Sequence, residues 1–187
     1  MIFKDYANYY DSFYPDSKYQ NESLNLFNVI RALTTSEFRF HKALEIGCGT
    51  GRFSQHISNY VHNLIAIDIS EKMIEIASRK PNKKITFLNK NLEEMSSTGK
   101  YDAIFSLFHV ISYFNENEMD SFVNFCKENV AKNGYVIFDY WEKSAVLKNP
   151  PINSEKIAVF NNQIIRIQDD VTDDEHQSIG NRSHHRR

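Results

Sequence analysis

Glycine is concentrated in one short segment of this 187-residue chain. Of the six glycines, three stand at Gly47, Gly49 and Gly51, within five residues. Glycine adopts left-handed backbone conformations without strain and lets a ligand approach the main chain closely. A single tight turn needs only one or two glycines, so the spacing predicts a ligand-binding loop.

This glycine loop follows a predicted strand, residues 42–46, and opens a helix predicted to begin at Arg52. The N–H groups at the start of such a helix face the ligand. The spacing is G-x-G-x-G, whereas the dinucleotide fingerprint needs glycine at position 52, where Arg52 stands. The Gly-Lys-Ser/Thr sequence of a P-loop does not follow either. The loop therefore favours an adenosine ligand without a pyrophosphate, and a nicotinamide dehydrogenase is disfavoured.

A carboxylate ends the next predicted strand, 63–68. Asp68 stands close to the position, about 20 residues after the glycines, where an acidic residue holds a ribose in dinucleotide sites. A carboxylate can accept hydrogen bonds from both vicinal hydroxyls. The alternative is that Asp68 only caps the helix that starts at Ser70. With the glycine loop upstream, we predict the ribose role.

Strands and helices alternate along the chain. Strands are expected at 42–46, 63–68, 85–88, 101–108 and 135–139, and helices at 22–33, 52–58, from Ser70 to Pro81 and at 116–131, where Asn133-Gly134 would end the last helix. This order predicts an α/β, Rossmann-like open sheet, mostly parallel and twisted, with helices on both faces. Ligands of such sheets bind at the carboxyl ends of the strands. The glycine loop, Asp68, Asn91 and the pair Phe108-His109 all fall on that edge.

The end of the chain differs in composition. Pro150-Pro151 interrupts it, and 156–168 is expected to form a strand or hairpin arm. An acidic run and then a basic run follow. We expect one domain over residues 1–175, in which 1–36 form an N-terminal lid and helix, and a disordered tail at 176–187. Antiparallel strands after the fifth strand are expected to be short or missing.

Composition excludes several classes of protein. Lys and Arg number 22 against 24 Asp and Glu, so nothing indicates a nucleic-acid partner. Two cysteines, Cys48 and Cys126, exclude a disulfide scaffold, and no metal is implied. No signal peptide or membrane-spanning run is visible. We expect a cytoplasmic protein without a membrane partner, whose oligomeric state the sequence does not fix.

The segments ALEIGCGTGRFS, IAIDIS, FLNKNLEEM and YDAIFSLFHVISYF resemble the class I S-adenosylmethionine-dependent methyltransferases, over about residues 1–148. The resemblance implies S-adenosylmethionine as cofactor. The glycine loop would pack against its methionine part, Glu45 would orient that loop and the amino group, and Asp68 would hold the ribose. Near the adenine the resemblance places Met73, Asn91 and Leu92, with Asn91 where the family often has an acidic residue.

The N-terminal segment YANYYDSFYPDSKY resembles the lid of small-molecule methyltransferases, including those acting on the amine of nucleotide-linked aminosugars. The resemblance implies that Tyr10, Tyr14 and Tyr19 cover the cofactor and that Phe108 belongs to its binding site. It also implies that His109 and Tyr113 face the substrate as the catalytic pair. For His109 the residues leave two roles open, a general base and a structural histidine.

These observations predict methyl transfer from S-adenosylmethionine to a small-molecule acceptor, an amine such as an aminosugar. Two alternatives stay open: an O-methyltransferase for a small hydroxyl or carboxyl acceptor, and a non-catalytic protein that binds S-adenosylmethionine. The second gains weight from the few residues that follow Trp141, because a missing last strand could remove part of the substrate pocket.

Overall fold

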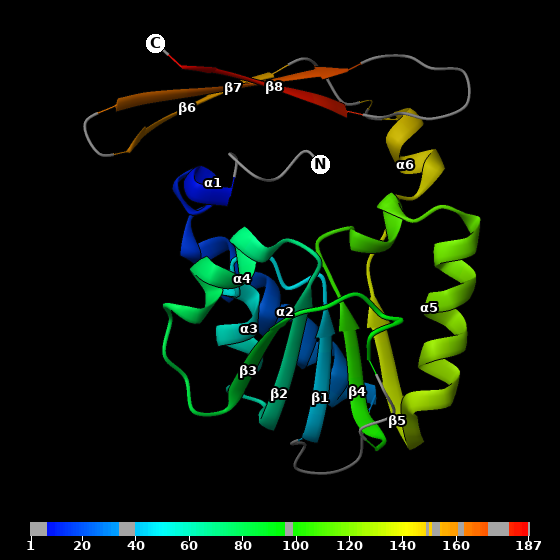
Figure 1. Cartoon of the computed structure of the whole chain (residues 1–187). Helices are drawn as coiled ribbons and strands as arrows, with labels where there is room; N and C mark the ends of the chain where they lie inside the picture. Colours follow the sequence, from blue (N-terminus) through cyan, green and yellow to red (C-terminus); the bar gives the residue numbers. More distant parts are fainter. Residues whose placement is uncertain are drawn as a thin grey trace. The chain divides into compact units, whose positions relative to one another are not determined.

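The structure is a computed structural model that describes residues 7–33, 40–95, 99–148, 150, 154–160, 163–171 and 180–186. The chain divides into two compact units. Residues 16–140 form the larger unit, and Met1–Pro15 together with Trp141–Arg187 form the smaller one. Each unit is described by itself (Figure 1).

The larger unit is built on a parallel sheet of five strands in the order β3-β2-β1-β4-β5. The strands are β1 (Phe40–Ile46), β2 (Val61–Asp68), β3 (Ile85–Asn89), β4 (Tyr101–Ser106) and β5 (Val130–Phe138). The chain builds the sheet outward from β1 on one side and then from β4 on the other, so the order reverses between these two strands. The carboxyl ends of β1 and β4 are therefore the expected place for a ligand. The predicted Rossmann-like sheet is confirmed.

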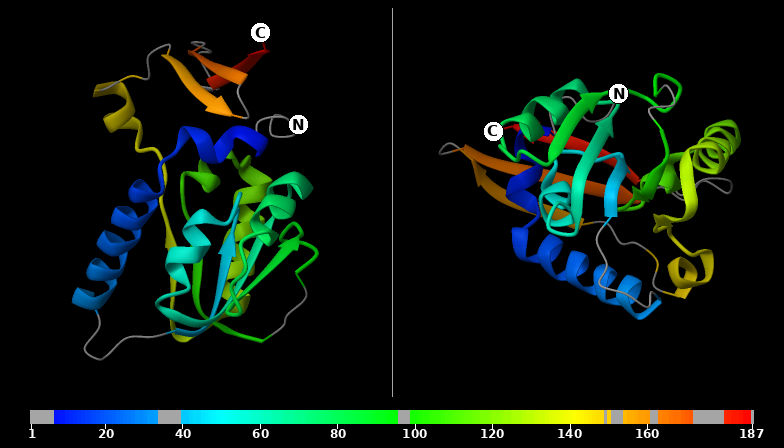
Figure 2. Two further views of the ribbon diagram at one scale, coloured as in Figure 1. Left: turned by 90° about the vertical axis from the view of Figure 1, so that its left-hand side faces the viewer. Right: turned by 90° about the horizontal axis from the view of Figure 1, so that it is seen from below.

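Helices cover both faces of this sheet (Figure 2). The larger unit contains α2 (Asp16–Leu33), α3 (Arg52–Ile57), α4 (Glu71–Ser78), the short 3-10 helix η1 (Val110–Tyr113) and α5 (Glu116–Asn129). Successive strand residues point to opposite faces. Leu44 and Ile104 pack with Phe122 of α5, whereas the Phe105 ring lies 6.1 Å from that of Phe27 in α2. Both faces of β1 and β4 are thus buried, as their apolar sequences predict.

Several element boundaries differ from the expectation, and three of the differences have a clear local cause. Helix α2 begins at Asp16 rather than 22, because Pro15 precedes it and Asp16 places a negative charge in its first turn. Strand β4 ends at Ser106, because Phe108 and the residue after it have positive φ. Helix α5 ends at Asn129, because the β-branched Val130 is extended and starts β5, so Asn133-Gly134 lies inside that strand and the predicted stop is wrong.

The smaller unit contains α1 (Ala7–Phe13), α6 (Lys143–Lys148) and an antiparallel sheet of β6 (Ser154–Phe160), β7 (Gln163–Val171) and β8 (Gly180–Arg186). The single strand or hairpin arm expected at 156–168 is divided between β6 and β7, which pair with each other, so antiparallel strands are present as a sheet of their own. Residues 180–186 were expected to belong to a disordered tail but form strand β8. Its register sets Arg182 opposite Asp169, and pairing through the backbone needs no apolar alternation. Residues 176–179 and 187 lie outside the described part, and the single-domain extent 1–175 stays a prediction.

Within the described residues, no helix combines the length and the apolar character needed to cross a membrane.

Candidate functional site

The glycine loop has a left-handed backbone at all three glycines, with φ of +76° at Gly47, +54° at Gly49 and +73° at Gly51. The N–H groups of Gly47 and Cys48 donate to the Ile67 carbonyl, at 2.8 and 3.0 Å. The Gly51 N–H donates to the Cys48 carbonyl at 2.9 Å. These bonds fix the loop between the ends of β1 and β2.

The three glycines have different surroundings. A Cβ atom at Gly47 would lie 2.6 Å from Cγ2 of Val110 in η1, and one at Gly51 would lie 2.7 Å from the Phe87 ring. At Gly49 nothing lies within 4 Å of such an atom. Gly47 and Gly51 therefore serve close packing, and the segment after β4 lies against the loop. The open space at Gly49 lets a ligand reach the backbone.

Substitutions in the loop should separate these roles. We expect Gly51→Ala to lower the free energy of unfolding by roughly 2–5 kcal/mol, from left-handed strain plus the clash with Phe87. Gly49→Ala should cost only the strain, roughly 1–2 kcal/mol. Urea unfolding of both variants beside the wild type measures this difference, and equal losses would contradict the assigned packing role of Gly51.

Asp68 connects the glycine loop to α4. Its Oδ2 accepts the Gly49 N–H at 2.8 Å, and its Oδ1 accepts the Ser70 N–H at 2.8 Å. The side chain of Ser70 accepts the Met73 N–H and so supplies the N-cap of α4 itself. Burial raises the pKa of Asp68, while these two N–H donors oppose that rise. Each carboxylate oxygen has two lone pairs, so each keeps one for a hydroxyl donor.

Glu45 is buried at the end of β1, with 3% of its surface exposed. The Ser54 hydroxyl of α3 donates to its Oε2 at 2.5 Å. Burial raises the pKa of Glu45 to about 7; the Ser54 bond opposes this rise and the negative charge of Asp68 adds to it. The contact with α3 suits a residue that holds the loop. Its predicted contact with the cofactor amino group stays a prediction.

The raised pKa of Glu45 makes stability depend on pH. The folded state binds the proton more tightly than the unfolded chain, so this stabilisation is complete below pH 4.5 and is lost as pH rises to about 7. At 1.36 kcal/mol per unit, the loss is about 3 kcal/mol. We expect Glu45→Gln to gain that amount relative to the wild type between pH 4.5 and 8, measured by urea unfolding. A pH-independent difference between the two proteins would contradict the assignment.

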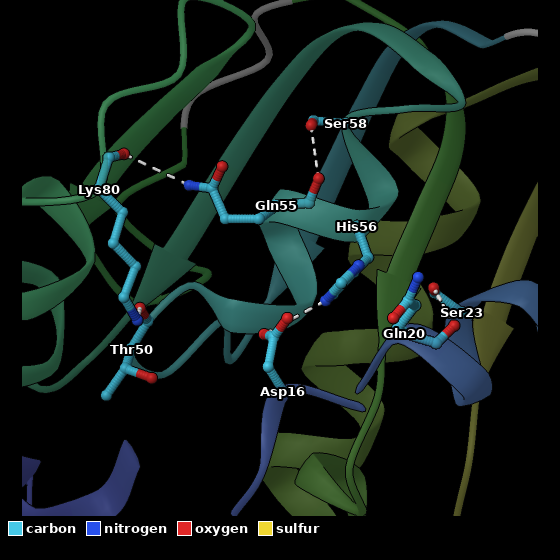
Figure 3. A network of polar contacts seen from close by, with 8 residues as sticks. All are labelled: Asp16, Gln20, Ser23, Thr50, Gln55, His56, Ser58 and Lys80. Carbon is cyan, nitrogen blue, oxygen red and sulfur yellow. Dashed lines mark hydrogen bonds and ion pairs between the residues drawn. The ribbon is translucent and has the colours of Figure 1, made fainter. Parts of the chain in front are cut away.

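Side chains of α3 and of the turn after α4 hold the glycine loop through hydrogen bonds. The Lys80 ammonium donates to the Thr50 carbonyl at 2.7 Å, and the Gln55 side chain donates to the Lys80 carbonyl at 3.3 Å (Figure 3). The Ser58 hydroxyl donates to the Gln55 carbonyl at 2.6 Å. The loop, α3 and the turn after α4 are thereby connected. This network could not be predicted from the sequence, because its donors come from ordinary polar positions.

The start of α2 packs on the same region. Tyr19 is buried, and its ring lies 4.8 Å from that of Phe108 and 5.8 Å from the Arg52 guanidinium. His56 Nε2 of α3 lies 3.4 Å from Asp16 Oδ1 (Figure 3). The structure thus brings Tyr19 and Phe108 together, two of the predicted cofactor-binding residues.

The other two predicted lid residues, Tyr10 and Tyr14, belong to the smaller unit. Their rings lie 4.8 Å apart, tilted by 36°. Their role as a cover for the cofactor stays a prediction.

Of the residues predicted to lie near the adenine, Met73 is buried in α4, and Leu92 packs against the core formed with α5. Asn91 and Glu94 form a reciprocal turn, in which each side chain accepts the other's backbone N–H at 2.9 Å. Ile69, directly after Asp68, is 80% exposed and was not among the predicted site residues. The feature of the sequence that could have indicated this residue is its apolar type directly after the carboxylate that ends the strand.

The segment after β4 carries the predicted catalytic pair. Phe108 and His109 are left-handed, with φ of 63° and 62°. Asp139, the residue after β5, accepts both of their N–H groups, from Phe108 at 3.0 Å and from His109 at 2.7 Å. The side chains of His109 and Tyr113 are 41% and 65% exposed. Asp139 was not among the predicted site residues. Like Asp68, it is an acidic residue at the end of a parallel strand, and this position could have indicated it.

Comparisons with known proteins agree with this geometry. A family model described as a methyltransferase domain matches residues 43–134. A malonyl-acyl-carrier protein O-methyltransferase of Ilyobacter polytropus is 33% identical over 106 residues, which cover 54% of this chain and 37% of the relative. A dTDP-3-amino-3,4,6-trideoxy-alpha-D-glucopyranose N,N-dimethyltransferase of Streptomyces venezuelae is 24% identical over 140 residues, covering 73% and 57%.

Among solved structures, the SAM-bound amino pentose methyltransferase CalS10 from Micromonospora echinaspora is similar in fold. Its TM-score is 0.69 at 15% identity, with coverage of 93% of this chain and 71% of that one. The chain spans only 37% and 57% of the length of the two curated relatives. These findings agree with the resemblance noted in the sequence: residues 43–134 match a methyltransferase-domain model, and the chain is similar in fold to a solved S-adenosylmethionine-bound methyltransferase.

Proposed function

We propose that this protein transfers the methyl group of S-adenosylmethionine to a small-molecule acceptor. The observation that carries the proposal is the contact between Asp68 and the Gly49 N–H at 2.8 Å, beside the open space at Gly49. This contact places a carboxylate, which can accept hydrogen bonds from hydroxyl groups, next to a backbone that a ligand can approach. A ribose with its 5′ substituent directed along the loop fits that arrangement.

The residues of this region fit S-adenosylmethionine, a cofactor that needs no pyrophosphate site. Asp68 would accept hydrogen bonds from the two ribose hydroxyls. The glycine loop, which Glu45 holds through its bond to α3, would bind the methionine part. Ile69, with its exposed apolar side chain, would lie beside the adenine. The remaining proposed cofactor contacts are Met73, Asn91, Leu92, Phe108, Tyr10, Tyr14 and Tyr19.

When bound, S-adenosylmethionine supplies an electrophilic methyl group on a sulfonium. The protein has to orient the acceptor and remove its proton. His109 and Tyr113 follow β4, next to the glycine loop; Tyr113 is exposed and His109 is part-exposed. We assign to His109 the removal of the acceptor's proton and to Tyr113 the orientation of the acceptor.

For the acceptor, we propose the amine of an aminosugar. The similarity to the Streptomyces venezuelae dimethyltransferase, which covers the larger share of this chain, supports an amine. The similarity to the Ilyobacter polytropus enzyme, at higher identity over fewer residues, supports a second candidate, a carboxyl acceptor.

Transfer of radiolabelled methyl from S-adenosylmethionine to a panel of acceptors tests the proposal. The panel contains nucleotide-linked aminosugars, the same sugars with hydroxyl in place of amine, and malonyl thioesters. We expect label on the aminosugars and none on their hydroxyl counterparts. Label on the malonyl thioesters alone would overturn the amine proposal, and label on none, with S-adenosylhomocysteine still bound, would support the non-catalytic alternative.

A further inference from the structure

Phe108 and His109 form an uncommon turn at the carboxyl end of β4. Both are left-handed in succession although neither is glycine. Non-glycine residues adopt this conformation only where their surroundings enforce it. Successive N–H groups of such a turn converge on one point and form a concave site for an anion. Here that anion is the carboxylate of Asp139.

The carboxylate is fixed by the sheet. Strands β4 and β5 pair up to Ser106 and Phe138, and the Asp139 N–H continues this pairing by donating to the Ser106 carbonyl at 3.3 Å. Its Oδ1 then lies 2.7 Å from the His109 nitrogen and its Oδ2 lies 3.0 Å from the Phe108 nitrogen. One side chain of β5 therefore fixes the backbone that follows β4.

We infer that Asp139 is a positioning residue for the proposed methyl transfer, because its carboxylate holds the turn that directs His109 toward the acceptor. This inference rests on the proposed function. His109 Nδ1 lies 3.9 Å from Asp139 Oδ2, which is too far for a hydrogen bond but close enough for an ion pair when the imidazole is protonated. The hydrogen bonds of Asp139 go to the backbone of the turn, and these bonds fix the position of His109.

The same turn sends the neighbouring side chain in another direction. The Phe108 ring lies 4.8 Å from the ring of Tyr19 and 5.4 Å from that of Phe53, between α2 and α3. Phe108 thus anchors one side of the turn in packed aromatic rings, while His109 is part-exposed on the other. If the carboxylate is lost, the backbone between them is no longer fixed.

Asp102 offers a matched control. Its Oδ2 accepts two successive N–H groups, from His41 at 2.8 Å and from Lys42 at 3.0 Å. This contact lies at the amino end of β4, whereas Asp139 acts at its carboxyl end. Asp102→Asn and Asp139→Asn therefore remove the same kind of interaction at opposite edges of the sheet. An amide keeps one acceptor oxygen and turns its NH₂ toward a donor.

The experiment measures amide hydrogen exchange by NMR, S-adenosylhomocysteine affinity and steady-state turnover in the full chain. For Asp139→Asn we expect exchange of the Phe108 and His109 amides to be at least tenfold faster and kcat at least tenfold lower. For Asp102→Asn we expect both values within twofold of the wild type. In a His109→Ala background, Asp139→Asn should lower kcat by less than a further twofold, because its effect passes through His109.

Two results would overturn the inference: retained protection of both amides in Asp139→Asn, or an undiminished loss of kcat when the substitution is added to His109→Ala. Failure of the proposed function is seen separately, as a wild type that neither binds S-adenosylhomocysteine nor methylates the panel. Amide exchange then still decides whether Asp139 holds the turn, since it needs no ligand.

Discussion

His109→Ala is expected to lower the turnover of methyl transfer by about 10²–10⁴-fold, the usual effect of losing an acid–base group. The part-exposed imidazole of His109 belongs to the segment after β4, next to the glycine loop, and is the side chain to which we assign removal of the acceptor's proton. Tyr113→Phe removes only a hydroxyl and should lower turnover in the same range. In both variants S-adenosylhomocysteine affinity should stay within twofold, because neither side chain is assigned to the cofactor.

Steady-state kinetics on the acceptor that the panel identifies checks this result. His62→Ala serves as the matched control, since His62 is also exposed but lies near the amino end of β2. If His109→Ala and Tyr113→Phe turn over as fast as His62→Ala, these two residues are structural.

Asp68→Ala should weaken S-adenosylhomocysteine binding at least tenfold. The ribose would lose hydrogen bonds to a charged group, each contributing roughly 1.5–3 kcal/mol, and each 1.4 kcal/mol is a factor of ten in affinity. The substitution also leaves the Gly49 and Ser70 N–H groups without their acceptor. Titration calorimetry on the variant, with its fold verified by circular dichroism, measures the change.

Asp102→Ala is the control for that substitution, because it removes another carboxylate that accepts two backbone N–H groups. Its affinity for S-adenosylhomocysteine should match that of the wild type. An Asp68→Ala variant that is folded and binds as tightly as Asp102→Ala would contradict the ribose role.

The sheet could be predicted because its signals are local. Apolar runs such as 63–67 mark strands buried on both faces, and the glycines between β1 and α3 mark a turn that other residues enter only with strain. Once the order of strands and helices is known, the rule for carboxyl ends places Asp68 and the segment after β4 on one edge.

Other features depend on contacts between distant residues. The left-handed turn at Phe108 and His109 is held by Asp139, thirty residues later, and the sequence FHVISYF contains no glycine or asparagine that would mark such a turn. The burial of Glu45 depends on Ser54 in the next helix. Strand β8 forms because β7 offers a free backbone edge, although its polar residues show no strand pattern. A single sequence contains no local signal for such pairings.

Titration of the wild-type protein with S-adenosylhomocysteine and with NAD tests the central claim most directly, because the glycine loop and Asp68 are common to both kinds of site. The loop has Arg52 where a dinucleotide site needs glycine, and Asp68 retains lone pairs for a ribose. We expect saturable binding of S-adenosylhomocysteine, abolished or strongly weakened in Asp68→Ala, and no detectable heat with NAD. Tighter binding of NAD than of S-adenosylhomocysteine would contradict the account.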